Sequence, residues 1–494
     1  MSNLIFLPIV IPLLASIVAA LFAKQLRGVR LFSQITAVLS LVFISGLTFY
    51  IFSEGTIVGQ AGGWQAPYGI SIVGDPLAML LVTTTNVIGT AALFYAPRIL
   101  ERQQETFYFY GFYFLLISGV SGAFMTGDLF NLFVFFEVLL MASYGLIVLG
   151  NGKAQLRESF KYVLFNLFSS MLFIVSVAYI YSITGTVNFA QLAERVESVD
   201  QQGALTTVGV ILFFVFAVKG AIFPLYYWLP NSYVVPNPVV SALFGALLTK
   251  VGIYSIIRIY TLIFVHETGV THQLFIWLAM LTMLFGVIGA LSTHNVKLII
   301  AYNIIPAVGF MLMGVGLYSP ESIAGSVYYL MHDMVIKGAL FFLIGALVVA
   351  AGTKDLRQMS GVIQRYPLLG WIFFVASLIL AGVPPFSGFI GKILLLEGGL
   401  AQEEFLLVIV ALLSSLLILL SMMRIFVYGF WGEKMDGMSS DYKHIRKLTI
   451  PGVVLVGIAI FLGVGAEFVY PHIESISNML YDRTEYISSV LKES

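Results

Sequence analysis

The chain contains no cysteine among its 494 residues. Disulfide bonds, thiolate metal sites and cysteine-ligated iron–sulfur clusters are therefore excluded. Charged residues are also scarce, at 10% of the sequence, whereas soluble domains carry about 25%. The 25 basic and 25 acidic residues balance, and no arginine-rich cluster indicates a nucleic-acid surface. The sequence also lacks a nucleotide fingerprint, a nucleophile elbow and a metal-ligand cluster. We therefore expect no cofactor, no metal site and no enzymatic activity.

Apolar residues dominate the chain instead, at 59%. Apolar stretches of about 20 residues, long enough to span a bilayer, predict fourteen transmembrane helices. They begin near residues 3, 31, 76, 107, 129, 159, 206, 238, 272, 296, 322, 369, 403 and 450. No second soluble domain fits, so the sequence predicts an all-α integral membrane protein with one domain, residues 1–494, embedded in the lipid bilayer.

Most lysines and arginines fall in alternate loops, which sets the orientation. With the amino terminus outside, they cluster on the cytoplasmic side, and only Arg195, Arg483 and Lys492 lie clearly in external segments. This asymmetry predicts a multi-pass plasma-membrane protein with both termini outside. The external segment 53–75 is expected to form a hairpin, and residues 450–494 a last helix with an amphipathic tail.

Five ionisable residues lie inside apolar spans: Glu137, Lys219, Lys250, Lys337 and Lys392. Each costs about 2.5 to 3.5 kcal/mol at the centre of a membrane helix on insertion scales, so we expect them to have a function. A buried lysine beside a carboxylate can exchange a proton when its partner moves. The pattern therefore indicates a proton relay.

The expected partners differ from one group to the next. Glu137 and Lys219 have no opposite charge within a turn of their own helices, so we predict that they form an ion pair with each other. Asp333 precedes Lys337 by four residues, which favours a structural ion pair as an alternative to a transport role. His332 is either a further step of the relay or a hydrogen-bonded core histidine. Asp75, Asp128 and Glu397 lie near span ends, where we expect solvated side chains.

Prolines interrupt two of the predicted spans. Pro224 follows Lys219 in the seventh, and Pro384 and Pro385 precede Lys392 in the twelfth. Proline removes a backbone donor and clashes with the preceding turn, so both helices are expected to break there. Spans 4–8 (107–261) and 9–13 (272–430) then form two inverted five-helix repeats, each with a broken fourth helix. A simple kink in packed helices remains the alternative.

Several segments together resemble a known family. They are GDLFNLFVFFEVLLMASYGLIVLG, KGAIFPLYYWLPNSYVVPNPVVSALFGALLTKVGIYSIIRIY, HDMVIKGALFF, LAGVPPFSGFIGK and the external GGWQAPYGI. They resemble the antiporter-like subunits of respiratory complex I and, more closely, the D subunits of Mrp-type multisubunit cation/proton antiporters. The resemblance implies fourteen helices, two inverted repeats and a charged axis in the membrane middle. It also implies an interacting Glu137–Lys219 pair, with Lys250 and Lys392 continuing the relay.

The positions at which this chain differs from the complex I subunits favour the Mrp family. Tyr226, Asn303 and Ala307 lie at or near positions where complex I relatives have histidine, serine and histidine, and Lys392 stands where one complex I paralogue has glutamate. We expect a proton-translocating subunit of a cation/proton antiporter that exchanges Na⁺ and works with other membrane subunits. A proton-pumping subunit of complex I or of a membrane hydrogenase is the first alternative, and a membrane scaffold with structural charges is the second.

Overall fold

The computed structural model describes residues 2–150, 152–199, 201–265 and 268–491, so Lys492 at the end of the predicted tail lies outside the described residues. The first part of the bundle contains α1 (Leu7–Leu21), α2 (Leu26–Glu54), α3 (Pro76–Ile99), α4 (Arg102–Gln104), α5 (Tyr110–Met125), α6 (Leu129–Ile147), α7 (Lys153–Thr184), α8 (Phe189–Arg195), α9 (Gln202–Gly220), α10 (Leu229–Val234), α11 (Pro238–Leu243) and α12 (Thr249–Leu262). The second part contains α13 (Thr268–Ser292), α14 (Val296–Tyr302), α15 (Ile304–Leu317), α16 (Pro320–Ala351), α17 (Val362–Arg365), α18 (Pro367–Ala381), α19 (Ser387–Ala401), α20 (Phe405–Ile425), α21 (Tyr442–Val464), α22 (Ala466–Tyr481) and α23 (Thr484–Leu491).

The helices confirm the predicted all-α membrane fold. In the described part of the chain, thirteen helices or joined helices are long and apolar enough to cross a membrane, and α18 is a shorter apolar helix. The predicted span beginning near residue 369 corresponds to α18 followed by α19. Local signals explain where several helices begin. For example, Pro76 opens α3, and the Asp75 carboxylate accepts a hydrogen bond of 2.8 Å from the backbone N–H of Ala78.

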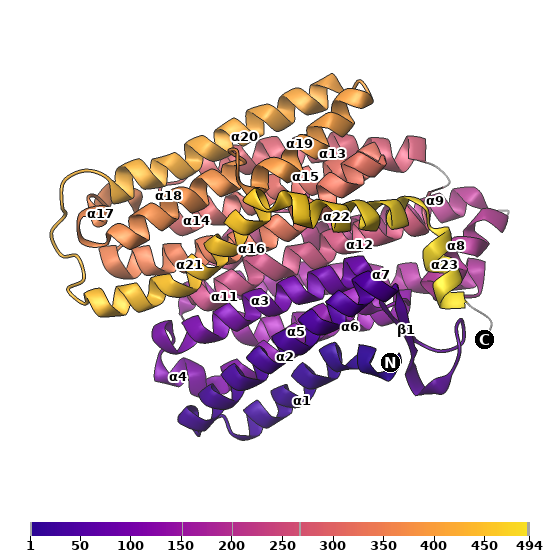
Figure 1. Ribbon diagram of the computed structural model, residues 1–494, viewed down its shortest axis with the longest axis horizontal. Helices are drawn as coiled ribbons and strands as arrows, with labels where there is room; N and C mark the ends of the chain where they lie inside the picture. Colours follow the sequence, from indigo (N-terminus) through magenta and orange to yellow (C-terminus); the bar gives the residue numbers. More distant parts are fainter. Residues whose placement is uncertain (1, 151, 200, 266–267, 492–494) are drawn as a thin grey trace.

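The hairpin predicted within residues 53–75 is also present. Strands β1 (Ile57–Gln60) and β2 (Ser71–Gly74) pair antiparallel, with Ile57 opposite Gly74. In Figure 1 the start of the chain, β1 and α23 lie at the same end of the bundle, on the right.

Helix α16 forms the centre of the molecule. It contacts α3 and α11 on one side and α15, α18 and α19 on the other, and α21 and α22 also pack against it. It is buried along most of its length, as is the joined helix α11–α12, whereas α1, α2, α7 and α20 leave many large apolar side chains exposed. Figure 1 shows α12 and α16 between the early helices and the late ones. The ionisable residues on α12 and α16 are therefore held away from lipid and water.

Two regions of the chain match in local structure. Helices α7 and α16 are each 32 residues long, and their bounds differ by the same 167 positions (153 to 320 and 184 to 351). Each ends at a glycine in the left-handed conformation, Gly185 and Gly352. An isolated bridge joins Asp128 to Asn188 after α7, and another joins Asn295 to Asp355 after α16, again 167 positions on. In Figure 1, α8 after α7 lies on the right and α17 after α16 on the left, so the two long helices run in opposite directions.

Candidate functional site

The first break separates α9 from α10 and contains Pro224, as predicted. Helix α9 ends at Gly220, and Ala221 adopts a left-handed φ of 60°. Side chains satisfy the backbone groups that the break frees. The Phe223 N–H donates to Thr282 Oγ1 at 3.0 Å, and the Trp228 indole N–H donates to the Val218 carbonyl at 3.1 Å. The break is therefore a stable part of the fold that lies directly after Lys219.

The second break separates α18 from α19 and contains Pro384 and Pro385, also as predicted. Lys392 closes it, because its ammonium donates to the Ala381 carbonyl, the last of α18, at 2.8 Å. The positive charge thus lies at the negative end of the α18 dipole. Gly382 makes room for the lysine, since a Cβ at this position would be 2.8 Å from Lys392 Cδ. The ammonium also lies over the Phe310 ring, 4.8 Å from its centroid.

Lys219 and Glu137 are near each other but not in contact. Among the residues that the structure describes, no ion pair joins them, so the predicted contact pair is absent from this conformation. Lys219 donates instead to Ser170 Oγ at 3.2 Å and to the Asn166 carbonyl at 3.3 Å, both on α7. Glu137 Oε1 is buried and has no hydrogen-bond partner in the described part of the chain. The two neutral oxygens of α7 account for the difference, and a functional coupling of Glu137 with Lys219 remains a prediction.

Lys250, Asp333 and Lys337 form a buried triad at the centre of the molecule. Asp333 lies 2.7 Å from Lys250 and 3.7 Å from Lys337, and all three side chains are fully buried. The predicted Asp333–Lys337 pair is therefore present, but Lys250 from α12 is the closer partner. Backbone oxygens accept the remaining bonds: Lys250 donates to the Gly245 carbonyl and Lys337 to the Asn303 carbonyl, both at 2.8 Å.

His332 lies beside the triad on α16. Its Nδ1 is hydrogen-bonded to Ser387 Oγ at 2.8 Å, whereas Nε2 has no hydrogen-bond partner among the described residues. Ser387 is the first residue of α19, the helix that carries Lys392. The histidine therefore links the triad helix to the second break.

Sequence reasoning did not find most of these contacts. The Lys250–Asp333 pair joins distant helices, and no local pattern indicates it. Asn303 accepts from Lys337 because the backbone is interrupted between α14 and α15, and Pro306 three residues later was the available signal.

The expectation of solvated side chains at span ends was wrong for Asp75, which is fully buried and paired with Arg258, and for Asp128, which is 5% exposed. Burial raises the pKa of Asp128 to about 6.

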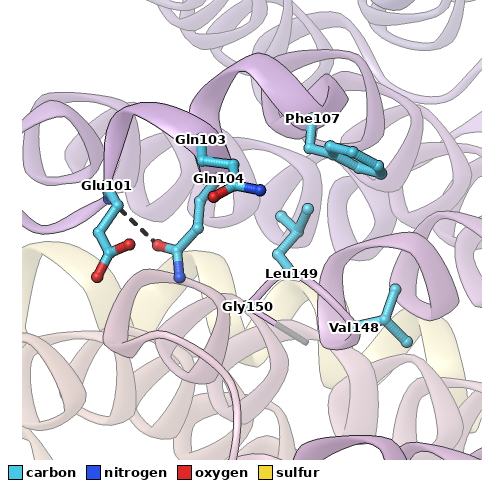
Figure 2. Close-up of a pocket in the computed structure, with 7 residues that line it drawn as sticks. All are labelled: Glu101, Gln103, Gln104, Phe107, Val148, Leu149 and Gly150. Atoms are coloured by element: carbon cyan, nitrogen blue, oxygen red, sulfur yellow. Dashed lines mark hydrogen bonds between the residues drawn. The ribbon is translucent and has the colours of Figure 1, made fainter. Parts of the chain in front are cut away.

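A surface cavity of about 230 Å³ lies apart from these residues. Glu101, Gln103, Gln104 and Phe107 line it together with residues 148–150, which follow α6. Figure 2 shows the Glu101 N–H bonded to the Gln104 side chain, which closes the turn of α4. None of the buried lysines lines this cavity.

Comparison with known proteins gives consistent matches. The family model described as NADH:quinone oxidoreductase/Mrp antiporter, transmembrane, matches residues 126–418. The D subunit of a Na⁺/H⁺ antiporter from Bacillus subtilis is 49% identical over 494 residues, all of both chains, and the one from Alkalihalophilus pseudofirmus is 48% identical over 493 residues. Among solved structures, a chain of the Mrp complex from Dietzia sp. is 30% identical with a TM-score of 0.92, covering 99% of both chains. A chain of respiratory complex I from Thermus thermophilus is 25% identical with a TM-score of 0.81, covering 95% of this chain and 99% of that one.

Proposed function

Because this chain belongs to the NADH:quinone oxidoreductase/Mrp antiporter transmembrane family, we propose that it is the proton-translocating subunit of a multisubunit Na⁺/H⁺ antiporter. The relatives named as Na⁺/H⁺ antiporter subunits match it along its whole length, which supports this assignment. It works as a secondary transporter subunit in the plasma membrane, together with other membrane subunits, and both termini lie outside.

The observation that carries the proposal is the row of ionisable groups across the bundle, in which the lysines and Asp333 are buried and Glu137 is half-buried. It begins at Glu137 on α6 and Lys219 on α9, and passes to the triad of Lys250, Asp333 and Lys337 on α12 and α16. It ends at Lys392 on α19. A membrane protein keeps such groups at a cost in insertion free energy, which a proton path explains better than packing does.

The chemistry in this row is proton exchange between nitrogen atoms. An ammonium gives a proton to the neutral amine of the next lysine, so one proton moves and no covalent bond between heavy atoms changes. Asp333 stabilises a positive charge on either of its two lysine neighbours. His332 provides an unpaired Nε2 between the triad helix and the second break, where it can bind or release a proton.

The two inverted five-helix repeats, residues 107–261 and 272–430, frame this path. The equal lengths of α7 and α16, their constant spacing along the chain and their opposite directions support the repeat. Each repeat contributes one broken helix, and each break adjoins a lysine of the row, Lys219 or Lys392. Backbone that is not helical inside a membrane is tolerated where it lines a polar path.

The test is alanine replacement at the start of the row. In vesicles that carry the whole antiporter complex, Glu137→Ala and Lys219→Ala should each abolish Na⁺-dependent proton flux, measured with a pH-sensitive dye. Unchanged flux in correctly assembled complexes would favour a scaffold with structural charges and overturn the relay.

A proton-pumping subunit of a redox complex is the second candidate function. The match to a complex I chain along 95% of this sequence favours it. The two functions differ in their driving reaction, because an antiporter exchanges Na⁺ for H⁺ without an electron donor. Na⁺-driven pH change in liposomes that hold the purified complex and no reductant would support the antiporter.

A further inference from the structure

We propose that a groove between α18 and α21 binds an anionic phospholipid, with the lipid phosphate at Arg365 and Arg446 and an acyl chain along α21. The inference is independent of the proposed relay, because none of the residues that line this groove belongs to the row from Glu137 to Lys392.

The groove lies between the first turns of α18 and α21, at the end of the bundle opposite the hairpin. Figure 1 shows α17 and the start of α21 toward the left and β1 on the right. Its lining comes from both helices: Tyr366, Leu368, Leu369, Tyr442, Ile445 and Arg446. Thr449 completes it and keeps its own hydroxyl on the Ile445 carbonyl at 2.8 Å. Arg446 is therefore the one charged residue among those that line a largely apolar surface.

Basic side chains without acidic partners surround the mouth of the groove. Arg446 and Lys443 are exposed, and Arg365 donates to the Ser440 carbonyl at 3.3 Å, just before the start of α21. In the described part of the chain, none of these three basic residues forms an ion pair. Asp441, the acid nearest to Lys443 in the sequence, caps the start of α21 with its carboxylate instead. The mouth thus carries uncompensated positive charge, and guanidinium groups are suited to phosphate oxygens.

Aromatic rings place this mouth at the depth of the lipid headgroups. Tyr366 and Tyr442 line the groove and stack on each other, with ring centroids 5.9 Å apart and planes at 10°. Tyr442 is 46% exposed, and Trp371 on α18 is 53% exposed. Exposed tyrosine and tryptophan gather at the membrane–water interface, because their rings are apolar with one polar edge. The two guanidinium groups therefore lie where phospholipid phosphates lie.

One face of α21 continues from the mouth toward the middle of the membrane. Tyr442, Arg446, Ile450 and Val454 are spaced by four residues, so they lie one above the other on the helix. All four are exposed, Ile450 by 44% and Val454 by 53%. This face is aromatic and cationic at the interface and apolar below it. A phospholipid has the same order, with a charged headgroup at the interface and acyl chains beneath.

The charge of the groove selects among the lipids of a membrane. A zwitterionic lipid carries an ammonium group that the guanidinium groups repel, whereas an anionic lipid has no such group to accommodate. Each basic residue near an anionic membrane surface strengthens binding about fivefold. Free phosphate would occupy the basic mouth only and would leave the apolar face of α21 uncovered.

The experiment uses phosphatidylglycerol with a photoactivatable diazirine in one acyl chain, added to the whole complex in nanodiscs. Peptide mass spectrometry should find the label on α18 and on residues 445–454 of α21. The double variant Arg365→Gln, Arg446→Gln should reduce this labelling roughly 25-fold at limiting lipid, because two charges are lost. The matched control is Lys24→Gln with Arg27→Gln, which removes two exposed charges at the same end of the bundle and should leave the labelling unchanged.

A second variant and a second measurement keep the inference falsifiable if the double variant fails to assemble. Arg446→Gln alone changes an exposed side chain and should reduce labelling about fivefold. A lipid held by α18 and α21 together binds only the folded bundle, so it stabilises the fold. Phosphatidylglycerol should therefore raise the thermal unfolding midpoint of the wild-type complex above its value in phosphatidylcholine, and Arg446→Gln should shrink this difference.

Three outcomes would contradict the proposal. Equal labelling of the groove by phosphatidylglycerol and phosphatidylcholine probes, or labelling that does not respond to Arg446→Gln, would show bulk lipid only. Competition by inorganic phosphate as strong as that by unlabelled phosphatidylglycerol would assign the basic mouth to phosphate alone. A groove that takes up no label in the whole complex would be covered by another subunit.

Discussion

Asp333 lies beside two lysines in a fully buried site. Its carboxylate lies 2.7 Å from Lys250 and 3.7 Å from Lys337, and the three side chains are fully buried. Removing one partner of a buried ion pair leaves the other charge uncompensated. This loss of folding free energy is larger than the free energy that the intact pair contributes. The stability of the protein and the charge state of the row therefore both depend on this one carboxylate.

Asp333→Asn should destabilise the protein by about 3 to 5 kcal/mol, the usual cost of breaking a buried ion pair, and should abolish proton flux. Thermal unfolding of the purified complex and flux in vesicles would measure the two effects. Asp333→Glu is the matched control because it keeps the negative charge. It should therefore retain more stability and more proton flux than Asp333→Asn. Wild-type stability of Asp333→Asn would mean that the lysines are neutral in the resting protein.

The buried lysines were predictable from the sequence, whereas most of their partners were not. Lys219, Lys250, Lys337 and Lys392 stand out because charge is rare in apolar spans. Their partners depend on which helix faces pack together, and no local pattern in the sequence indicates this packing. Asp333 was assigned to Lys337 because four residues make one helical turn, yet Lys250 from another helix lies closer.

At the scale of the element, the sequence predicted where two helices break but not which contacts close the breaks. Proline made both breaks predictable, because it cannot donate the backbone hydrogen bond that a continuous helix needs. The closure of each break was not predictable. Trp228 and Thr282 close the first, and the Lys392 ammonium closes the second, through contacts that form only in the folded bundle. A lysine of the proposed relay thus also caps the end of a helix.

Gly382→Ala tests this double role of Lys392. Gly382 has a φ of 84°, and an added Cβ would lie 2.8 Å from Lys392 Cδ, so the lysine side chain must shift, and we expect it to leave the Ala381 carbonyl. Gly352→Ala is the matched control, because Gly352 also ends a helix with a positive φ of 72° but has open space around a Cβ. Both variants should lose about 1 to 2 kcal/mol from the left-handed conformation, measured by thermal unfolding of the complex.

Only Gly382→Ala should also lose proton flux in vesicles, because only this variant displaces a lysine of the row. Equal flux in the two variants would show that the contact between Lys392 and the end of α18 has no part in transport.

At the scale of the whole molecule, a second buried charge pair joins segments from both ends of the chain. Arg258 on α12 pairs with Asp75, which caps α3 directly after the hairpin. The guanidinium also lies 5.0 Å from the ring centroid of Tyr486 on α23 and 5.5 Å from that of Tyr254. The end of the hairpin, α12 and α23 therefore meet at one cluster, which lies outside the proposed relay.

A double-mutant comparison tests whether this cluster is structural. Asp75→Asn leaves the Arg258 charge buried without its partner and should destabilise the complex by about 3 to 5 kcal/mol. Adding Arg258→Met removes that charge and fills the space with an apolar side chain, so the double variant should recover most of the loss. The expected flux per assembled complex is close to wild type in the double variant, because neither residue belongs to the row from Glu137 to Lys392. Thermal unfolding of the complex and proton flux in vesicles measure these effects. Arg258 pairs with Asp75 and not with Asp333, so we expect no role for it in transport. A double variant that is stable but inactive would contradict this and place Arg258 in the proton path.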